Sequence, residues 1–310
     1  MCLRRDRHGA DGSARPSDRQ CGVDSLRPHL YVTNATALND LFDQAIERIN
    51  LRGARDRLLV SGEVSRRQMW GIAGASGLGA PVLGVLISPV AGMVLGAGVL
   101  LSAAYSVPPV RLCARGAVAS LLLPLCYVAT PFVVGALSTG REMTWRGALL
   151  LAGGYAALAG RLLLKDFRDV QGDVLYGKRT FLIRHGRTAT CAWSAAFWSV
   201  GAALIAAAVP AAFVVVPVTL SLGGVYWGLQ QLGRAPDART GQEISTAIGR
   251  MGSAIALTVL AALQFEAAGA PPVTRWAGAA LIAAYFVGGL LCTLTVTSRR
   301  VEVSPGPAAA

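Results

Sequence analysis

Charged residues are scarce in this chain, and their scarcity excludes an ordinary soluble domain. Only 15% of its 310 residues are Asp, Glu, Lys or Arg, whereas a typical soluble protein has about a quarter. Runs with no charged residue extend over 68–110, 116–140, 188–233 and 276–298. A membrane-spanning helix needs about 20 apolar residues, so runs of this length predict transmembrane helices.

Clusters of His and Cys are also missing. The chain has 3 histidines far apart and 6 cysteines without a CxxC pair, which we interpret as free thiols. The N-terminus has no apolar segment of the kind that a signal peptide contains. These absences exclude a zinc protein and a disulfide-stabilised secreted domain.

The apolar segments predict an all-α fold, a polytopic transmembrane helical bundle with about eight spans and a partial N-terminal helix. The spans are expected at 69–87, 89–106, 116–138, 146–164, 188–208, 212–231, 250–269 and 277–297. Residues 1–28 are predicted to form a poorly ordered basic segment. The transmembrane domain is predicted to cover 29–300, followed by a short cytoplasmic tail at 301–310.

The basic residues are distributed asymmetrically along these spans. The net charge of +12 could indicate a nucleic-acid partner. If residues 1–68 are cytoplasmic, however, all basic residues except Arg141, Arg146 and Arg275 fall on the cytoplasmic side or its edge, as the positive-inside rule requires. The sequence therefore predicts a multi-pass cell-membrane protein whose partner is the lipid bilayer, not nucleic acid. The excess of Arg over Lys is typical of a GC-rich bacterial genome.

Two acidic clusters lie on this predicted cytoplasmic side. In "LNDLFDQAIERIN" at 38–50, Asn39, Asp43 and Glu47 recur every four residues and share one helix face. In "KDFRDVQGDVLYGKRT" at 165–180, Asp169 and Asp173 are also four apart. Like charges at this spacing destabilise a helix, so both faces need a counter-charge. Mg²⁺ prefers such oxygen ligands and bridges to phosphate; the alternative is a solvated loop beside a membrane helix.

Four segments in order resemble the UbiA superfamily of intramembrane prenyltransferases. The pattern NDxxDxxxD matches "NDLFDQAIE", and an RPLxSGxIS-like segment matches "RLLVSGEVS" at 57–65. YSxPPxRLK matches "YSVPPVRLC" at 105–113, and KDxxDxxGDxxxGKRT matches 165–180. The resemblance implies a helical bundle with a central cavity that opens toward the cytoplasmic face and sideways to lipid. It implies a Mg²⁺-dependent transfer of an isoprenyl group from an isoprenoid diphosphate to an aromatic or other lipophilic acceptor.

The resemblance also implies the site residues. The metal-binding residues would be Asn39, Asp40, Asp43 and Glu47 on one wall and Asp166, Asp169 and Asp173 on the other. The diphosphate would be contacted by Arg57, Arg111, Lys165 and Lys178. The catalytic residues would be Asp43, Asp169, Asp173 and Tyr105. As alternatives, Arg57 would face anionic lipid and Tyr105 would be a membrane-interface anchor.

The chain departs from the family pattern in four places. Glu47 replaces an aspartate, Leu58 replaces a proline after Arg57, and Cys113 replaces a lysine. The family has a complete transmembrane helix and most of a second before the first motif, whereas 1–28 is too polar to span a bilayer. We therefore expect a truncated or misassigned start. Two other functions stay open: a terpene cyclase of the same fold, or a truncated membrane protein without catalysis.

Overall fold

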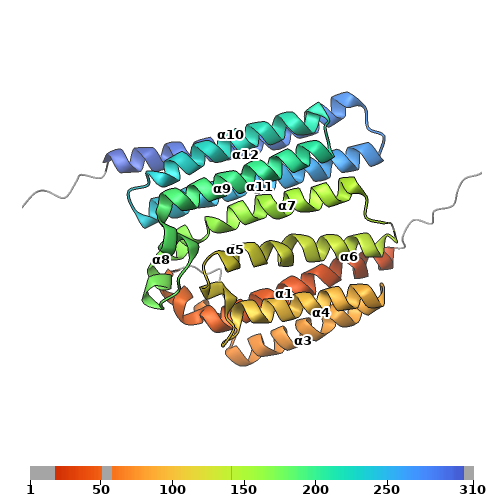
Figure 1. Cartoon of the computed structure of the whole chain (residues 1–310), viewed down its shortest axis with the longest axis horizontal. Coiled ribbons are helices and arrows are strands. Elements are labelled where there is room, and N and C mark those ends of the chain that lie inside the picture. Colours follow the sequence, from red (N-terminus) through yellow and green to blue (C-terminus); the bar gives the residue numbers. More distant parts are fainter. Residues whose placement is uncertain (1–17, 51–57, 141, 304–310) are drawn as a thin grey trace, which may run out of the picture.

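The structure, a computed structural model, describes residues 18–50, 58–140 and 142–303 (Figure 1). In these ranges the elements are all helical and no β-strand occurs, which confirms the predicted all-α bundle. The N-terminal elements are α1 (Asp18–Asn50), α2 (Leu58–Ser61), α3 (Arg66–Val85), α4 (Pro89–Ser106), the 3₁₀ turn η1 (Leu112–Ala114), α5 (Ala117–Pro124) and the π-helix η2 (Leu125–Ala129). The C-terminal elements are α6 (Thr130–Ser138), α7 (Trp145–Leu163), α8 (Asp166–Leu175), α9 (Phe181–Ala208), α10 (Ala212–Gly233), α11 (Ala238–Ala267) and α12 (Pro272–Val303).

The long helices lie side by side and successive ones run antiparallel, while the short α8 lies at one end of the bundle (Figure 1). Six stretches are long and apolar enough to cross a membrane: Pro89–Ser106, Ala117–Ser138, Phe181–Ala208, Ala212–Gly233, Thr240–Ala267 and Pro272–Cys292. Helices α3 and α7 lie at the other two predicted positions but are not among these six stretches. The count of eight spans therefore stays a prediction.

Several helices extend beyond their predicted spans. Helix α9 begins at Phe181, but its backbone is not helical at Gly186, so the part that contains the span predicted from 188 starts after this kink. Helix α11 begins at Ala238, before the span predicted from 250. Both starts are capped, because the side chains of Thr180 and Asp237 accept hydrogen bonds from backbone N–H groups of the first turn. Hydropathy marks only the apolar part of a helix, so the polar first turns of α11 lie outside its predicted span. Similarly, α1 begins at Asp18, within the segment 1–28; residues 1–17 and 304–310 lie outside the described residues.

Glycines allow α7 and α9 to pack closely. A Cβ atom on Gly201 would lie 2.8 Å from the backbone N of Ala157, and one on Gly160 would lie 2.9 Å from the carbonyl oxygen of Ser194. Small residues at such crossings are common where membrane helices associate. The largest buried cluster, which includes Trp198, Leu232 and Met251, lies among the C-terminal helices. Smaller clusters lie around α1, α3 and α4, so the molecule has two packed halves.

The span at 117–138 is interrupted in its middle. The π-helix η2 separates α5 from α6 and is flanked by Pro124 and Pro131, residues that lack a backbone donor and disturb regular helix geometry. Single-turn π-helices are frequent at functional sites. Here the widened turn contributes Cys126 and Tyr127 to the lining of the cavity described next.

Candidate active site

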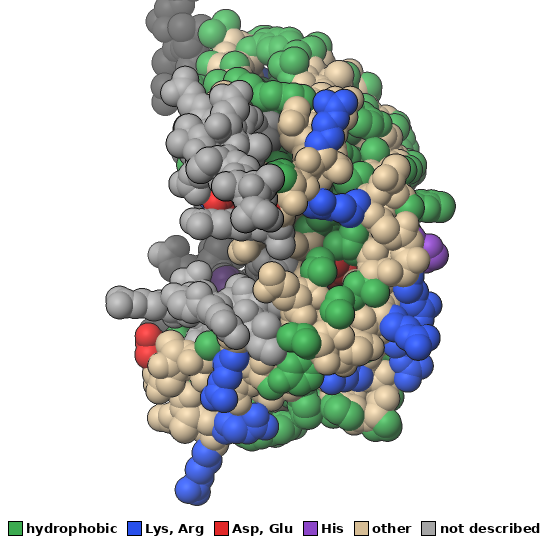
Figure 2. All heavy atoms as spheres, turned by 90° about the vertical axis from the view of Figure 1, so that its left-hand side faces the viewer, with side chains coloured by type: hydrophobic (Ala, Val, Ile, Leu, Met, Phe, Trp, Pro, Cys, Tyr) green, Lys and Arg blue, Asp and Glu red, His purple; other side chains and the backbone are tan. Residues whose placement is uncertain are grey.

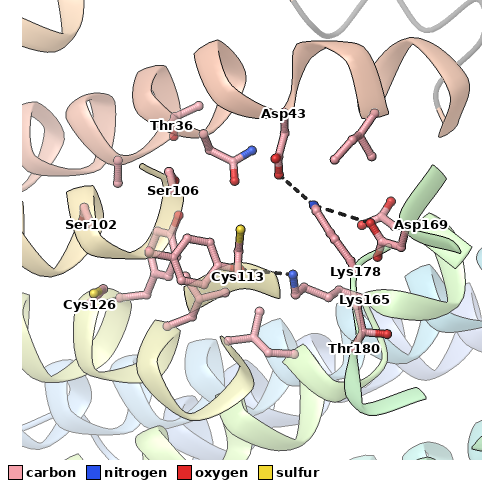
Figure 3. A pocket seen from close by; sticks show the side chains of 18 of the residues that line it. Thr36, Asp43, Ser102, Ser106, Cys113, Cys126, Lys165, Asp169, Lys178 and Thr180 are labelled. Atoms are coloured by element: carbon pink, nitrogen blue, oxygen red, sulfur yellow. Dashed lines mark hydrogen bonds and ion pairs between the residues drawn. The ribbon is translucent and has the colours of Figure 1, made fainter. Parts of the chain in front are cut away.

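A cavity of about 470 Å³ lies among α1, α4, η2, α7 and α8, and Figure 3 shows its lining. Eight of the residues predicted from the sequence line it: Asn39, Asp43, Glu47, Tyr105, Lys165, Asp169, Asp173 and Lys178. They come from α1, α4, α8 and the loops next to α8. The cavity therefore brings together segments that are far apart in the sequence.

One wall of the cavity is a face of α1. The four-residue spacing of Asn39, Asp43 and Glu47 places all three on this face, as predicted. Asp43 and Glu47 are buried. Buried carboxylates are costly unless they are paired or hydrogen-bonded, so this wall requires cationic neighbours.

The opposite wall is α8 with the loop that follows it. Asp169 and Asp173 line the cavity from α8. After α8 the chain turns at Gly177, whose φ of 67° is in the left-handed region that glycine adopts at little cost. This turn directs the side chain of Lys178 back between the two walls (Figure 3).

Lys178 joins the two acidic motifs. Its Nζ lies 3.0 Å from Asp43 Oδ2 and 3.4 Å from Asp173 Oδ1. Its side chain is only 9% exposed, so solvent screens these contacts little. Because both oxygens contact the same Nζ, Asp43 Oδ2 and Asp173 Oδ1 are no farther apart than the sum of these two distances. Mg²⁺, whose Mg–O contacts are about 2.1 Å, can bridge that separation together with a diphosphate. The two acidic faces thus meet at one cavity, as their spacing predicts.

Arg111 is a second cation at Asp43. Its Nη2 donates to Asp43 Oδ1 at 2.7 Å. Its backbone has a φ of 35°, a conformation that costs a non-glycine residue energy and that is often found at functional sites. Cys113, at the position of the family's lysine, is buried and lines the cavity. Arg111 therefore places a positive charge beside Asp43, although it is not among the cavity-lining residues.

Lys165 and Tyr105 form a third polar contact in the cavity. The Lys165 Nζ donates to the Tyr105 hydroxyl at 3.2 Å. The same Nζ lies 3.8 Å from Asp166 Oδ1. Asp40 and Asp166 are buried but are not among the cavity-lining residues. Arg57 lies outside the described residues, so its predicted role stays a prediction.

Burial shifts the acids of α8. It raises the pKa of Asp173, against the opposing effect of Lys178. It raises the pKa of Asp166 to about 6; Lys165 opposes this rise, while Asp173 and Asp169 add to it. The folded protein therefore takes up a proton at Asp166 at a higher pH than the unfolded chain, whose Asp pKa is near 3.9.

We expect Asp166→Asn to stabilise the metal-free protein at pH 7.5 by on the order of 2 kcal/mol. A raised acid pKa means that ionisation destabilises the fold above about pH 6, and the neutral amide removes this cost. The gain should shrink as the pH falls from 6 to 4, because Asp166 then becomes neutral in the wild type as well. Thermal unfolding in EDTA across this pH range measures the effect. A variant less stable than wild type at pH 7.5 would show that the ionised carboxylate stabilises the fold.

The donors of the cavity fit Mg²⁺ held jointly by protein and ligand. Among the described residues, no three His, Cys, Asp or Glu side chains are arranged to hold a metal ion by themselves. Apart from its ion pair with Lys178 at 3.4 Å, the buried Asp173 Oδ1 makes no hydrogen bond, and Asp43 and Asp173 face one another across Lys178. Mg²⁺ typically takes one or two carboxylates and completes its shell with water and phosphate oxygens. The residues present match that requirement.

Several cavity residues were not among the predicted site residues. They are Thr36, Ser102, Ser106, Cys113, Cys126, Tyr127, Arg161 and Thr180. One signal was available, because Ser102 and Ser106 lie four apart in an otherwise apolar span. Polar residues within a membrane span usually face the bundle interior or a cavity.

Two comparisons of sequence bear on this cavity. The model of the UbiA prenyltransferase family matches residues 26–254. The bacteriochlorophyll synthase 33 kDa chain of Cereibacter sphaeroides is 31% identical over 160 residues. That match covers 48% of this chain and 49% of the relative, so the chain spans about half the length of that protein.

Solved structures share the fold. A UbiA homolog from Archaeoglobus fulgidus bound to DMAPP and Mg²⁺ has a TM-score of 0.54 at 15% identity, over 91% of this chain and 89% of that one. The same homolog bound to GPP and Mg²⁺ has a TM-score of 0.54 at 16% identity, over 90% and 89%. At these identities the likeness shows the fold alone.

Proposed function

Because this chain belongs to the UbiA prenyltransferase family, we propose that it transfers an isoprenyl group from an isoprenoid diphosphate to an aromatic or other lipophilic acceptor. The observation that carries the proposal is Lys178, which joins Asp43 and Asp173 at one cavity. The structurally similar homolog was solved with two isoprenoid diphosphates, each with Mg²⁺. That homolog supports both the donor class and the metal.

The acidic walls would hold Mg²⁺, and the cations would hold the diphosphate. Bound Mg²⁺ would neutralise the charge that develops on the leaving diphosphate. Asp43 and Asp173 would be its main protein ligands, with Asn39, Glu47 and Asp169 close to them. Lys178, Arg111 and Lys165 would turn from the carboxylates to phosphate oxygens, which accept strong charge-assisted hydrogen bonds. No protein nucleophile is required.

The rest of the cavity would protect the reacting carbon. The C–O bond to the diphosphate breaks, and the bonding electrons leave with the diphosphate. The acceptor then forms a bond to that carbon and loses a proton. Leu123, Leu158 and Leu162 also line the cavity and would exclude water from the allylic cation. Tyr105 lines the cavity and contacts Lys165, and it would position the acceptor.

The proposed orientation puts the α8 end of the bundle in the cytoplasm. Figure 2 shows this end with Lys and Arg side chains spread over its surface and little exposed acidic surface. Cytoplasmic ends of membrane proteins carry this excess of basic residues. The diphosphate donor, which is soluble at its head and apolar at its tail, would then bind from the cytoplasmic side.

Turnover of geranyl diphosphate tests the proposal. Purified protein in lipid nanodiscs is incubated with the donor, Mg²⁺ and a panel of phenols, and released diphosphate is measured. We expect release that requires both Mg²⁺ and an acceptor and that yields a prenylated product. Cyclic products formed without an acceptor would instead identify a terpene cyclase. No release under any of these conditions would contradict catalysis.

A further inference from the structure

The cavity ends abruptly inside the bundle. Along the four long segments that surround it, the deepest lining residues are Ala35 in α1, Ser102 in α4, Tyr127 in η2 and Leu158 in α7. In Figure 3, Ser102 and Cys126 lie at one end of the cavity and the charged residues lie at the other. The closed end therefore lies opposite the proposed diphosphate site.

Tyr31 lies about one helical turn beyond the last lining residue of α1. It is 1% exposed. A Cβ atom on Gly98 of α4 would lie 2.9 Å from Tyr31 Cε2 and 3.3 Å from Thr130 Cγ2. Tyr31, Gly98 and Thr130 thus form one packed layer, and the absence of a side chain at Gly98 leaves room for the tyrosine ring. We call this layer the cavity floor.

The hydroxyl of Tyr31 does not explain why a tyrosine is here. Ser102, Cys126 and Thr130 surround it, yet it has no hydrogen-bond partner of adequate geometry. A buried tyrosine hydroxyl usually has one. The contribution of Tyr31 is therefore its volume, which fills the space between α1, α4 and η2 directly below Ser102 and Cys126.

The length of the cavity can be read along α1. Asp43 and Tyr31 lie on one continuous helix, and their positions differ by about 18 Å of rise at 1.5 Å per residue. An isoprene unit has four bonds along its chain and spans roughly 5 Å when extended, since three backbone bonds span about 3.8 Å. Three units thus need roughly 15 Å and four need roughly 20 Å. Only three fit between the acidic walls and the floor.

We propose that Tyr31 is a specificity-determining residue that limits the isoprenyl donor to three isoprene units. The inference rests on the proposed function, because it takes the diphosphate to bind at Asp43 and Asp173. It goes further in naming the donor class: dimethylallyl, geranyl and farnesyl diphosphates bind, and the C20 geranylgeranyl diphosphate is excluded by the floor.

Binding of donors of increasing length tests the wild type. Dissociation constants are measured in detergent with Mg²⁺ for the C5, C10, C15 and C20 diphosphates, and for inorganic diphosphate. We expect affinity to rise from C5 to C15 and to fall at least about tenfold at C20, equivalent to about 1.4 kcal/mol. Equal binding of C15 and C20 would show that the tail leaves the cavity between helices. That result would overturn the limit on donor length and leave the proposed function standing. If neither inorganic diphosphate nor any donor binds, the proposed function fails together with the inference.

Two variants change the depth of the cavity in opposite directions. Tyr31→Ala removes the ring and should restore C20 binding to within about threefold of C15, because the added space accommodates a fourth unit. Cys126→Phe places a larger side chain in the cavity and should weaken C15 binding about tenfold while C5 binding stays within about twofold. Tyr285→Ala and Cys292→Phe, both at exposed positions on α12, are matched controls and should keep the wild-type profile.

The two variants are independent, so the inference does not depend on either one folding. Loss of a fully buried tyrosine destabilises a core, and thermal unfolding shows whether Tyr31→Ala is folded before its binding is interpreted. If folded Tyr31→Ala keeps the wild-type preference, the floor does not set the length. If Cys126→Phe weakens C5 and C15 equally, the deep end of the cavity does not hold the tail.

Discussion

Asp173→Asn is expected to lower Mg²⁺-dependent release of diphosphate from an isoprenoid donor by about 10²–10³-fold, the usual effect of removing one group that stabilises developing charge. Asp173 lines the cavity from α8, is buried and contacts Lys178. The amide cannot supply the negative charge that Mg²⁺ requires. Initial rates of diphosphate release at saturating donor measure the effect.

The same variant should leave the metal-free protein at least as stable as wild type. Burial raises the pKa of Asp173, which means that its ionised form is disfavoured in the fold at neutral pH. Lys178 keeps its contact with Asp43 at 3.0 Å. Asp237→Asn is the matched control, because Asp237 caps α11 and asparagine caps equally well. A structural role alone would appear as a lower melting temperature of Asp173→Asn with an unchanged Mg²⁺ response.

Lys178→Met is expected to destabilise the metal-free protein by about 3 kcal/mol, because removing one partner of a buried ion pair leaves an uncompensated charge. The lysine side chain is 9% exposed and contacts both Asp43 and Asp173. In the variant, Mg²⁺ without donor should restore part of the lost stability, since the metal can replace the missing positive charge. Thermal unfolding with EDTA, with Mg²⁺ and with Mg²⁺ plus geranyl diphosphate separates these effects.

Two further variants control this experiment. Arg184→Met removes a cation from an exposed position outside the cavity lining and should change neither stability nor the Mg²⁺ response. The double variant Lys178→Met with Asp173→Asn should recover part of the stability, because the unpaired carboxylate has been neutralised. If Lys178→Met has the same melting temperature as the wild type in EDTA, and Mg²⁺ alone does not raise it further, Lys178 does not act as the counter-charge.

The helical bundle and the acidic walls could be predicted because both depend on local periodicity. Uncharged runs identify membrane helices whatever their packing, and a four-residue spacing places Asp43 and Glu47 on one face in any helix. The start of α11 at 238 was missed, since its polar first turns carry no hydropathy signal. In α9 a kink at Gly186 separates residues 181–185 from the predicted span.

The ion pairs could not be predicted, because they depend on how distant segments pack. Lys178 and Asp43 are 135 residues apart. Sequence spacing indicated that both would be near the diphosphate, but not that the lysine would link the two motifs. Arg111 likewise contacts Asp43 across 68 residues of sequence, and its left-handed backbone conformation has no signal in the residue type at that position.

The cavity floor could not be predicted from the sequence for a related reason. Residues 29–38 were interpreted as only part of a helix, yet in the structure Ala35 and Thr36 line the cavity and Tyr31 lies beneath it. The contact between Tyr31 and Gly98 joins two helices whose crossing point is set by side-chain packing. A limit on donor length therefore required the structure.

The central claim is that the two acidic motifs form one Mg²⁺–diphosphate site, and the most direct test is ligand-dependent stability of the wild type. Thermal unfolding is measured in detergent with geranyl diphosphate, once with Mg²⁺ and once with EDTA. At a donor concentration 100-fold above Kd, we expect stabilisation of about 2.7 kcal/mol with Mg²⁺ and none with EDTA. No stabilisation with Mg²⁺, or the same stabilisation in EDTA, would contradict the claim.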